Sequence, residues 1–295
     1  MIDPIAVEIG PFQLHWYGII IASAVLIAAL LGARVARMLG ESPDDGWSML
    51  LLVVVLAVVG ARIYHVIHQW DFYLVNPALI PQIWNGGIGI PGAVAGGALA
   101  IFLYTRSKGL TTARWLDIFA PALLLGQVIG RLGNFVNQEL YGPPTDLPWG
   151  IPIEAANRVP PWNDLNAYPV ESTVFHPLFA YEALLNLVGM VVLLLVIRRF
   201  GHRLFAGDLA LMYIIWYGAV RAVLETFRTD NWVILGVPTA IWVGVIGFVL
   251  AGAWLLYRHR RGWGSPMIRP SQEPPPKGTG EATAEHRPGP EASPG

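Results

Sequence analysis

The sequence contains no cysteine and carries little charge. Of its 295 residues, 13% are charged and 54% are hydrophobic, whereas soluble domains carry roughly 25% charged residues. The absence of cysteine excludes disulfides, thiolate metal ligands and a cysteine nucleophile within the chain. A formal net charge of −1 gives no electrostatic basis for nucleic-acid binding. The composition therefore indicates a membrane protein rather than a large soluble domain.

Apolar runs long enough to cross a bilayer recur along the chain. A spanning helix needs about 20 mostly apolar residues, and seven windows meet that requirement: 17–36, 48–68, 87–104, 116–135, 177–197, 208–227 and 237–257. The third window is rich in glycine, and Gly92 and Gly96 have the spacing of small residues at a close contact with another helix or with a lipid. We therefore expect an all-α polytopic membrane protein with seven transmembrane helices.

Lysine and arginine are concentrated in alternate loops, and cytoplasmic loops carry an excess of these residues. The first, third and fifth loops and the segment after the last window contain Arg34, Arg37, Arg106, Lys108, Arg114, Arg198, Arg199, Arg203, Arg258, Arg260 and Arg261. This bias predicts that the N-terminus lies outside the cell and the C-terminus in the cytoplasm.

Two stretches are not predicted to span. The loop 137–175 is long and rich in proline and tryptophan, which is more typical of a functional cap than of a connector. We expect it on the extracytoplasmic side, between the fourth and fifth spans. Residues 263–295 are rich in Pro, Gly and Glu and are expected to form a disordered cytoplasmic tail. The membrane domain is thus predicted to cover residues 1–262.

Arg62, Arg131 and Arg221 each fall in the outer half of a predicted span. Charges at that depth cost roughly 2.5–3.5 kcal/mol each on insertion scales, so they are expected to face a shared, partly hydrated cavity. Further polar residues gather at the same level: Tyr17, His65, His68, Asn134, Asn137, Glu139, His176, Tyr181, Glu182, Tyr217, Glu225 and Arg228. Because arginine keeps its charge and binds phosphate bidentately, the pattern favours a site for a phospholipid headgroup.

Structural explanations compete with this interpretation. Arg221 and Glu225, four residues apart on one helix face, also fit a simple ion pair. Arg62 also fits an ion pair with Glu139 or Glu182 and no further role.

Asn134 and Asn137 also fit a role in satisfying backbone groups at a helix end. His65 and His68 have no acidic or thiol partner at a suitable spacing, so no metal site is expected.

The motif "GRLGNFVNQELYG" at 130–142 resembles the signature of the prolipoprotein diacylglyceryl transferases. Three further stretches are similar to that family in the same order, namely "WYGII" at 16–20, "HPLFAYEALLN" at 176–186 and "YGAVRAVLETFR" at 217–228. The "GAR" at 60–62 also fits. The resemblance covers about residues 10–257 and is most specific in the first motif.

The resemblance implies a seven-span enzyme of the bacterial cytoplasmic membrane, with its active site toward the outer leaflet. Such an enzyme transfers the diacylglyceryl group of phosphatidylglycerol to the lipobox cysteine thiol of prolipoproteins, forming a thioether and releasing glycerol phosphate. It implies no cofactor. The partners are phosphatidylglycerol, lipobox peptides and the bilayer.

The polar pattern and the resemblance together give two sets of site residues. The resemblance implies that Arg131 and Arg221 hold the phosphate and that Tyr17, Asn134, Glu139 and Tyr217 line the site. The catalytic candidates are Arg131, Arg221, Tyr17, Glu139, Tyr217 and His176. The substrate-binding candidates are Arg131, Asn134, Asn137, Arg221, Glu225, Arg228, Arg62 and Gly92. Glu139, Tyr17 and His176 are the candidate proton acceptors for the thiol.

The sequence departs from the family pattern at two positions. Pro91 stands where many members carry a histidine proposed as a base, and Pro143 stands where an arginine is common. The first departure leaves the general base unassigned.

Two functions of other classes remain as alternatives. A transporter uses polar groups at the bilayer midplane and often has inverted repeats, whereas the polarity here is one-sided and no repeat is evident. A phospholipid-binding protein without chemistry needs the same arginines, and only turnover distinguishes it from the transferase.

Overall fold

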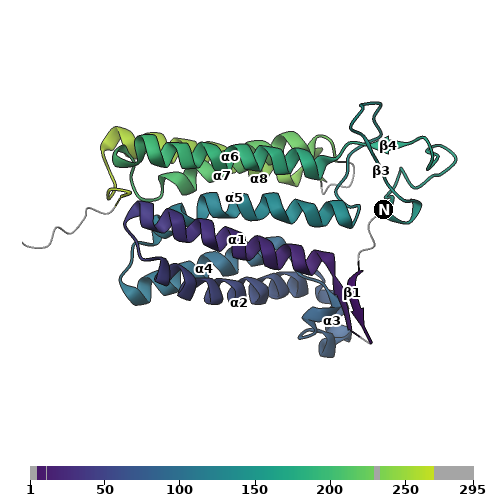
Figure 1. Ribbon diagram of the computed structural model, residues 1–295, viewed down its shortest axis with the longest axis horizontal. Coiled ribbons are helices and arrows are strands. Elements are labelled where there is room, and N and C mark those ends of the chain that lie inside the picture. Colours follow the sequence, from purple (N-terminus) through teal and green to yellow (C-terminus); the bar gives the residue numbers. More distant parts are fainter. Residues whose placement is uncertain (1–4, 11, 229–232, 269–295) are drawn as a thin grey trace, which may run out of the picture.

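Seven long helices make up most of the chain in the computed structural model, which describes residues 5–10, 12–228 and 233–268. They lie side by side in an elongated bundle (Figure 1). Their bounds are α1 Trp16–Leu39, α2 Pro43–His68, α4 Ile90–Lys108, α5 Thr112–Val136, α6 Leu178–Phe200, α7 Asp208–Glu225 and α8 Thr239–Arg261. Each of the seven predicted windows overlaps one of these helices.

Five helices are long and apolar enough to cross a membrane, namely α1, α2, α5, α8 and the segment Leu178–Arg203 that includes α6. The chain is therefore a mostly helical polytopic membrane protein. The other two are less apolar: α4 is rich in glycine and ends in basic residues, and α7 contains Asp208, Arg221 and Glu225. The seven-span topology stays a prediction.

The two ends of the bundle differ in charge. The last turns of α1, α4, α6 and α8 contain basic residues, and we call the end where these helices finish the basic end. We call the opposite end, where α5 and α7 finish, the cap end, because the segment 137–177 covers it (Figure 1).

Short elements flank the cap end. A hairpin of β1 Ile5–Ile9 and β2 Phe12–His15 precedes α1, and the short helix α3 Trp70–Val75 follows α2. The cap contains the strand pair β3 Ile151–Pro152 and β4 Val174–Phe175, and a last pair, β5 Val233–Ile234 and β6 Val237–Pro238, joins α7 to α8. Four 3-10 turns complete the described elements: Pro77–Leu79, Ile83–Asn85, Ala155–Asn157 and Gly201–Arg203.

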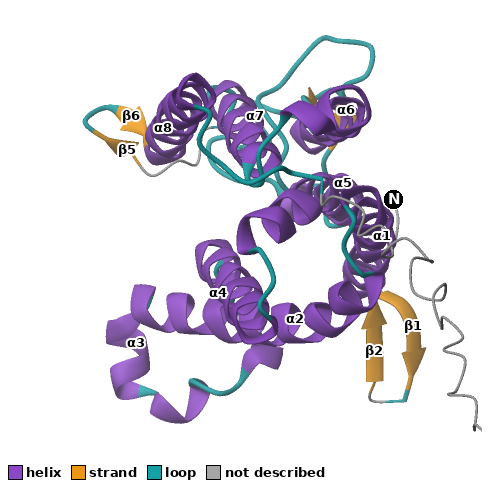
Figure 2. Cartoon of the chain, turned by 90° about the vertical axis from the view of Figure 1, so that its left-hand side faces the viewer, coloured by secondary structure: helices purple, strands orange, loops and turns teal. Residues whose placement is uncertain are grey.

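Helix α5 is the centre of the bundle. It contacts α1 and α4 on one side and α6 and α7 on the other, and the end view shows α2 and α4 on the opposite side of α5 from the group α6, α7 and α8 (Figure 2). Its buried Trp115, Ile118 and Leu124 lie in the same apolar core cluster as Leu39 of α1 and Leu193 of α6. This position allows the end of α5 to meet side chains from both halves of the bundle.

Glycine permits the close approach of α2 and α4. A Cβ atom added at Gly92 would lie 2.1 Å from the carbonyl oxygen of Gly60, and one added at Gly60 would lie 2.3 Å from that of Gly92. Gly96 meets the Leu56 carbonyl oxygen in the same way, at 2.0 Å. Because backbone atoms cannot move aside as a flexible side chain does, all three positions exclude any larger residue.

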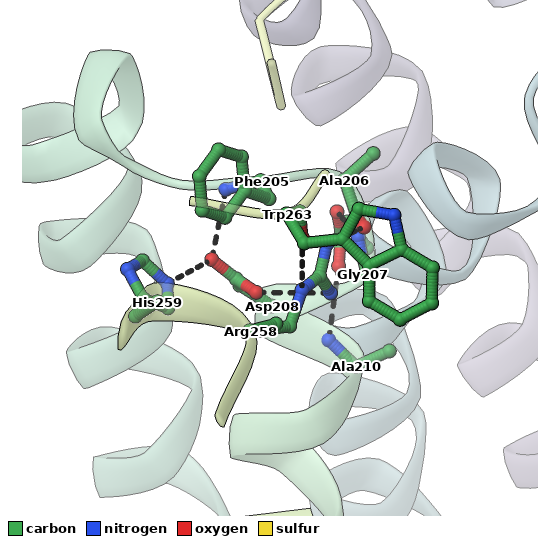
Figure 3. A network of polar contacts seen from close by, with 9 residues as sticks. Phe205, Ala206, Gly207, Asp208, Ala210, Arg258, His259 and Trp263 are labelled. Atoms are coloured by element: carbon green, nitrogen blue, oxygen red, sulfur yellow. Dashed lines mark hydrogen bonds and ion pairs between the residues drawn. The ribbon is translucent and has the colours of Figure 1, made fainter. Parts of the chain in front are cut away.

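A buried carboxylate organises the basic end (Figure 3). Asp208, at the start of α7, lies 3.1 Å from Nη1 of Arg258 and 2.7 Å from Nε2 of His259, both on α8. Asp117 of α5 accepts hydrogen bonds from the backbone N–H groups of Gly207 and Ala210 at 2.6 and 3.0 Å. Asp117 thereby satisfies donors that the start of α7 leaves unpaired. Together the two carboxylates tie α5, α7 and α8 to one another.

The chain after α8 folds back over the basic end. Arg114 donates hydrogen bonds to the carbonyl oxygens of Pro266 and Met267 and pairs with Glu41 at 2.5 Å. Met267 is fully buried, and its N–H donates to Leu204. Residues 263–268 are thus packed against the bundle, and the rest of the predicted tail lies outside the described residues.

The glycine contact predicts a position-specific effect of one added methyl group. We expect Gly92→Ala to destabilise the protein by about 1–3 kcal/mol, since it overpacks a backbone contact. The matched control is Gly97→Ala on the same helix, where the added Cβ would meet only the Val53 side chain at 3.8 Å. Thermal unfolding in detergent should show a lower midpoint for the first variant only, and equal midpoints would contradict the prediction.

Candidate active site

Three helices bring their polar residues together at the cap end. The motif-bearing end of α5, the first turns of α6 and the last turns of α7 meet there, because α5 runs antiparallel to α6 and packs against α7. Just after α5, Gln138 and Leu140 adopt left-handed backbone conformations, with φ of 54° and 58°. Such conformations are strained for residues other than glycine and cluster at functional sites. They turn the chain so that Glu139 faces back toward the helix end.

Glu182 of α6 lies between the two predicted arginines. Its Oε1 accepts a hydrogen bond from Nη2 of Arg131, and its Oε2 lies 3.8 Å from Nη1 of Arg221. The carboxylate is buried, with 5% of the residue exposed. Arg131 and Arg221, from different helices, are thus brought to one site by a shared anion.

Each arginine has a second partner from its own helix. Arg131 donates from Nη1 to Oδ1 of Asn134 at 2.9 Å, and Arg221 donates from Nη2 to Oε2 of Glu225 at 2.6 Å. The Arg221–Glu225 pair that the spacing predicted is present, and it lies within this larger network.

The two asparagines converge on Glu139. Its Oε1 accepts hydrogen bonds from Nδ2 of Asn134 at 3.2 Å and from Nδ2 of Asn137 at 3.0 Å. Asn134 therefore connects Glu139 to Arg131, so the polar residues of the motif form one chain of hydrogen bonds. The amide groups of the two asparagines therefore donate to the Glu139 carboxylate and do not satisfy backbone groups at the helix end.

Tyr217 lines an apolar cavity beneath the arginines. Its ring stacks on that of Tyr213, with centroids 5.8 Å apart and planes 6° apart, and the Tyr213 hydroxyl accepts a hydrogen bond from Gln127 at 3.0 Å. A cavity of about 430 Å³ lies between α7 and α8; its lining comprises Tyr213, Ile214, Tyr217, Gly218, Arg221, Thr239, Ala240, Val243, Gly244 and Gly247. Among the described residues that line it, Arg221 is the charged one.

A second, much smaller cavity lies on the other side of Arg221. Its volume is about 10 Å³, and it is lined by Leu140, Leu178, Phe179, Glu182, Arg221, Leu224 and Arg228. Arg221 thus borders two cavities, a small one shared with Glu182 and Arg228 and a larger one between α7 and α8. Arg228 joins the site from the end of α7.

Tyr17 and His176 lie at the edges of the network. The Tyr17 ring packs on Gly133, where an added Cβ would lie 2.7 Å from Cδ2 of the tyrosine. His176 Nδ1 is 3.1 Å from the Tyr181 hydroxyl, which also accepts a hydrogen bond from Nε1 of Trp149 at 2.8 Å. The histidine therefore belongs to a polar chain between α6 and the cap.

Two predicted substrate-binding residues lie apart from this network. The guanidinium of Arg62 donates four hydrogen bonds of 2.6–2.8 Å to backbone carbonyl oxygens of Leu79, Ile80, Gly86 and Gly87. It fastens the segment that follows α3 onto α2, and these bonds, rather than Glu139 or Glu182, occupy its donors. Gly92 lies in the contact of α4 with α2 described above. No group of three His, Asp or Glu side chains suited to a metal ion occurs within residues 5–10, 12–228 and 233–268.

The sequence of the chain is similar to those of known proteins along most of its length. The family model described as prolipoprotein diacylglyceryl transferase matches residues 4–258. Proteins named phosphatidylglycerol–prolipoprotein diacylglyceryl transferase are similar to this chain in Chloroflexus aggregans (43% identity over 90% of this chain and 92% of the relative) and in Streptococcus mutans (37% identity over 91% and 100%). The chain belongs to the prolipoprotein diacylglyceryl transferase family. The resemblance drawn from the motifs is confirmed, and with it the assignment of the chain as a transferase of lipoprotein maturation.

In this member of the prolipoprotein diacylglyceryl transferase family, the cap is held by residues that the sequence analysis did not select. The Tyr141 hydroxyl accepts from the Val159 N–H at 2.7 Å and donates to the Asn157 carbonyl oxygen at 3.2 Å. Burial raises the pKa of Tyr141 above its ordinary value of 10.0, so the hydroxyl keeps the proton that it donates. Arg158 donates to the carbonyl oxygens of Ile153 and Tyr168 at 2.9 and 2.5 Å.

Glu182, the carboxylate between the two arginines, is also absent from the predicted site residues. Its position at the outer end of a span was recognised, but its partners lie 51 and 39 residues away in sequence, since Arg131, Glu182 and Arg221 are on three helices. The signal available in the sequence was a lone acidic residue in the first turns of an apolar helix, which calls for a basic partner.

The Tyr141 contacts predict that one hydroxyl keeps the cap ordered. Tyr141→Phe retains the ring but removes two hydrogen bonds, each worth about 0.5–1.5 kcal/mol. We expect faster amide hydrogen exchange and faster proteolysis within 137–175. Tyr168→Phe is the control, because it keeps the ring that packs against Trp162 and the carbonyl oxygen that accepts from Arg158. Equal rates in the wild type and Tyr141→Phe would refute the role assigned to the hydroxyl.

Proposed function

We propose that the chain transfers the diacylglyceryl group of phosphatidylglycerol to the lipobox cysteine thiol of prolipoproteins, and that the network of Arg131, Glu182 and Arg221 is its active site. A thioether forms and glycerol phosphate leaves. Family membership and the printed names of the relatives support the reaction. The observation that supports the site is the meeting of two largely buried arginines from different helices, of which Arg221 borders an apolar cavity.

Arg131 and Arg221 are suited to hold the phosphate. Guanidinium groups bind phosphate oxygens with two parallel hydrogen bonds, and a partly buried site strengthens that attraction relative to water. Asn134, Asn137, Glu225 and Arg228 surround this pair and are proposed to shape the headgroup site. Gly92 and Arg62 stay predicted substrate contacts, and both lie outside the network.

The cavity between α7 and α8 is suited to an acyl chain. Its lining is mostly apolar, and it reaches Arg221, so one lipid molecule placed there has its tail in the cavity and its phosphate at the guanidinium. Gly218 and Gly244 approach each other closely along this wall, where an added Cβ at either would lie 2.5–2.6 Å from the other's carbonyl oxygen.

The chemistry requires an ionised thiol and a stabilised leaving group. A thiol has an ordinary pKa of about 8.5, and its thiolate is the nucleophile. Positive charge from Arg131 and Arg221 favours the thiolate and the departing phosphate together. The proton goes to a nearby acceptor, for which Glu139, Tyr17 and His176 are the candidates; Tyr217 lines the site beside them.

We further propose that all seven long helices cross the bacterial cytoplasmic membrane, with the cap end outside. The basic end then lies in the cytoplasm, as the excess of Lys and Arg in cytoplasmic loops requires. Phosphatidylglycerol enters from the surrounding bilayer, and the exported prolipoprotein reaches the same outer leaflet.

Purified protein, phosphatidylglycerol and a peptide bearing a lipobox cysteine test the reaction directly. Mass spectrometry is expected to detect a diacylglyceryl adduct on the cysteine peptide and none on its Cys→Ser counterpart. Phosphatidylglycerol binding without an adduct would instead support a lipid-binding protein or a transporter.

The same assay tests the two arginines. We expect Arg131→Ala and Arg221→Ala each to lower the rate of transfer by at least about 100-fold, the usual cost of removing a group that stabilises developing charge. Arg34→Ala, an exposed arginine at the basic end, is the control and should transfer normally. Near-normal activity in either site variant would overturn the assignment of the site.

A further inference from the structure

Glu182 holds the two arginines unequally. It hydrogen bonds to Arg131, which Asn134 also fixes. Its distance to Arg221 is 3.8 Å, beyond the 2.7–3.2 Å of an N–H···O hydrogen bond. Arg221 is fixed from the other side by Glu225. The contact between Glu182 and Arg221 is therefore the loose one in the network.

The loose contact lies where an anion can enter. The cavity of about 10 Å³ is lined by both Glu182 and Arg221, and that volume is about the size needed for one water. The larger cavity, between α7 and α8, also reaches Arg221. An incoming phosphate oxygen at Arg221 therefore arrives next to the Glu182 carboxylate.

The charges at the site make a phosphate and the Glu182 carboxylate compete for Arg221. Three arginines, Arg131, Arg221 and Arg228, supply positive charge around this point. Three carboxylates, Glu139, Glu182 and Glu225, supply negative charge. The carboxylates would repel an added phosphodiester anion unless one of them loses its contact with an arginine. Glu182 is the one whose contact with Arg221 is already longer than a hydrogen bond.

We propose that Glu182 is a positioning residue whose carboxylate occupies the place of the phosphate in the empty site. In the empty site the carboxylate orients both guanidiniums. When the lipid binds, the contact between Glu182 and Arg221 breaks and Arg221 binds the phosphate. The contact forms again when glycerol phosphate leaves. The inference depends on the proposed role of the two arginines in binding phosphate. It assigns Glu182 to the exchange of anions and not to the reacting atoms.

Removing the charge of Glu182 should therefore separate binding from turnover. In Glu182→Gln the arginines lose their competing anion, so both the lipid and the product bind more tightly. Tighter binding of substrate and product alike lowers KM without raising kcat, and slow product release limits turnover. We expect KM for phosphatidylglycerol to fall about threefold or more and kcat to fall about tenfold, with stronger inhibition by added glycerol phosphate.

The experiment uses full-length protein in detergent micelles with phosphatidylglycerol and the lipobox peptide, and measures kcat, KM and the inhibition constant of glycerol phosphate. Glu41→Gln is the matched control, because Glu41 is also a buried carboxylate paired with an arginine, Arg114, but at the basic end. It should lower the thermal midpoint while leaving KM and the inhibition constant unchanged. Glu182→Asp keeps the charge on a shorter side chain, and we expect its inhibition constant to lie between those of the wild type and Glu182→Gln.

Four results would overturn the inference. A raised KM in Glu182→Gln, or kinetic constants equal to those of the wild type, would show that the carboxylate does not compete with phosphate. A lower kcat at unchanged KM, with loss of the acidic limb of the pH–rate profile, would make Glu182 a proton acceptor instead. If Glu182→Gln does not fold, Glu182→Asp takes its place. An inhibition constant of glycerol phosphate equal to that of the wild type would then overturn the inference. Retained activity in Arg131→Ala or Arg221→Ala would refute the proposed site itself. The arginine variants therefore distinguish failure of the site from failure of the role proposed for Glu182.

Discussion

The sharing of one buried carboxylate by two arginines is the interaction on which the site depends. A lone arginine in an apolar helix bundle would carry an unpaired charge, and removing one partner of a buried pair is strongly destabilising. Glu182 offsets that cost for Arg131 and Arg221 at once, although the three residues belong to different helices. The convergence of α5, α6 and α7 at the cap end is therefore an electrostatic requirement as well as a matter of apolar packing.

The opposite end of the bundle uses buried charge differently. There Asp208, Arg258 and His259 pair among themselves, and Asp117 and Arg114 bind backbone groups of neighbouring segments. These charges have protein partners on several sides and border none of the cavities described above. Charge at the basic end thus fixes helices α5, α7 and α8 to one another, whereas charge at the cap end faces space that a ligand can enter.

Much of this arrangement follows from sequence, and the remainder depends on contacts that sequence does not encode locally. Apolar runs located the long helices, because hydropathy and helix length are local properties. The motif at 130–142 and the Arg221–Glu225 spacing predicted which polar groups gather. The partners of Arg62 could not be predicted, since they are carbonyl oxygens of an irregular segment. Burial of Met267 was missed because the residues around it resemble the polar tail that follows.

The reciprocal fit of Gly60 and Gly92 has a consequence for how this contact is inherited. In most helix pairs a larger residue on one side is balanced by a smaller one on the other, and the two positions then vary together. Here each missing side chain is filled by the partner's backbone, which no substitution can shrink. Each of the two positions should therefore be constant on its own account. We expect no correlated change between them among related sequences, although they are in contact.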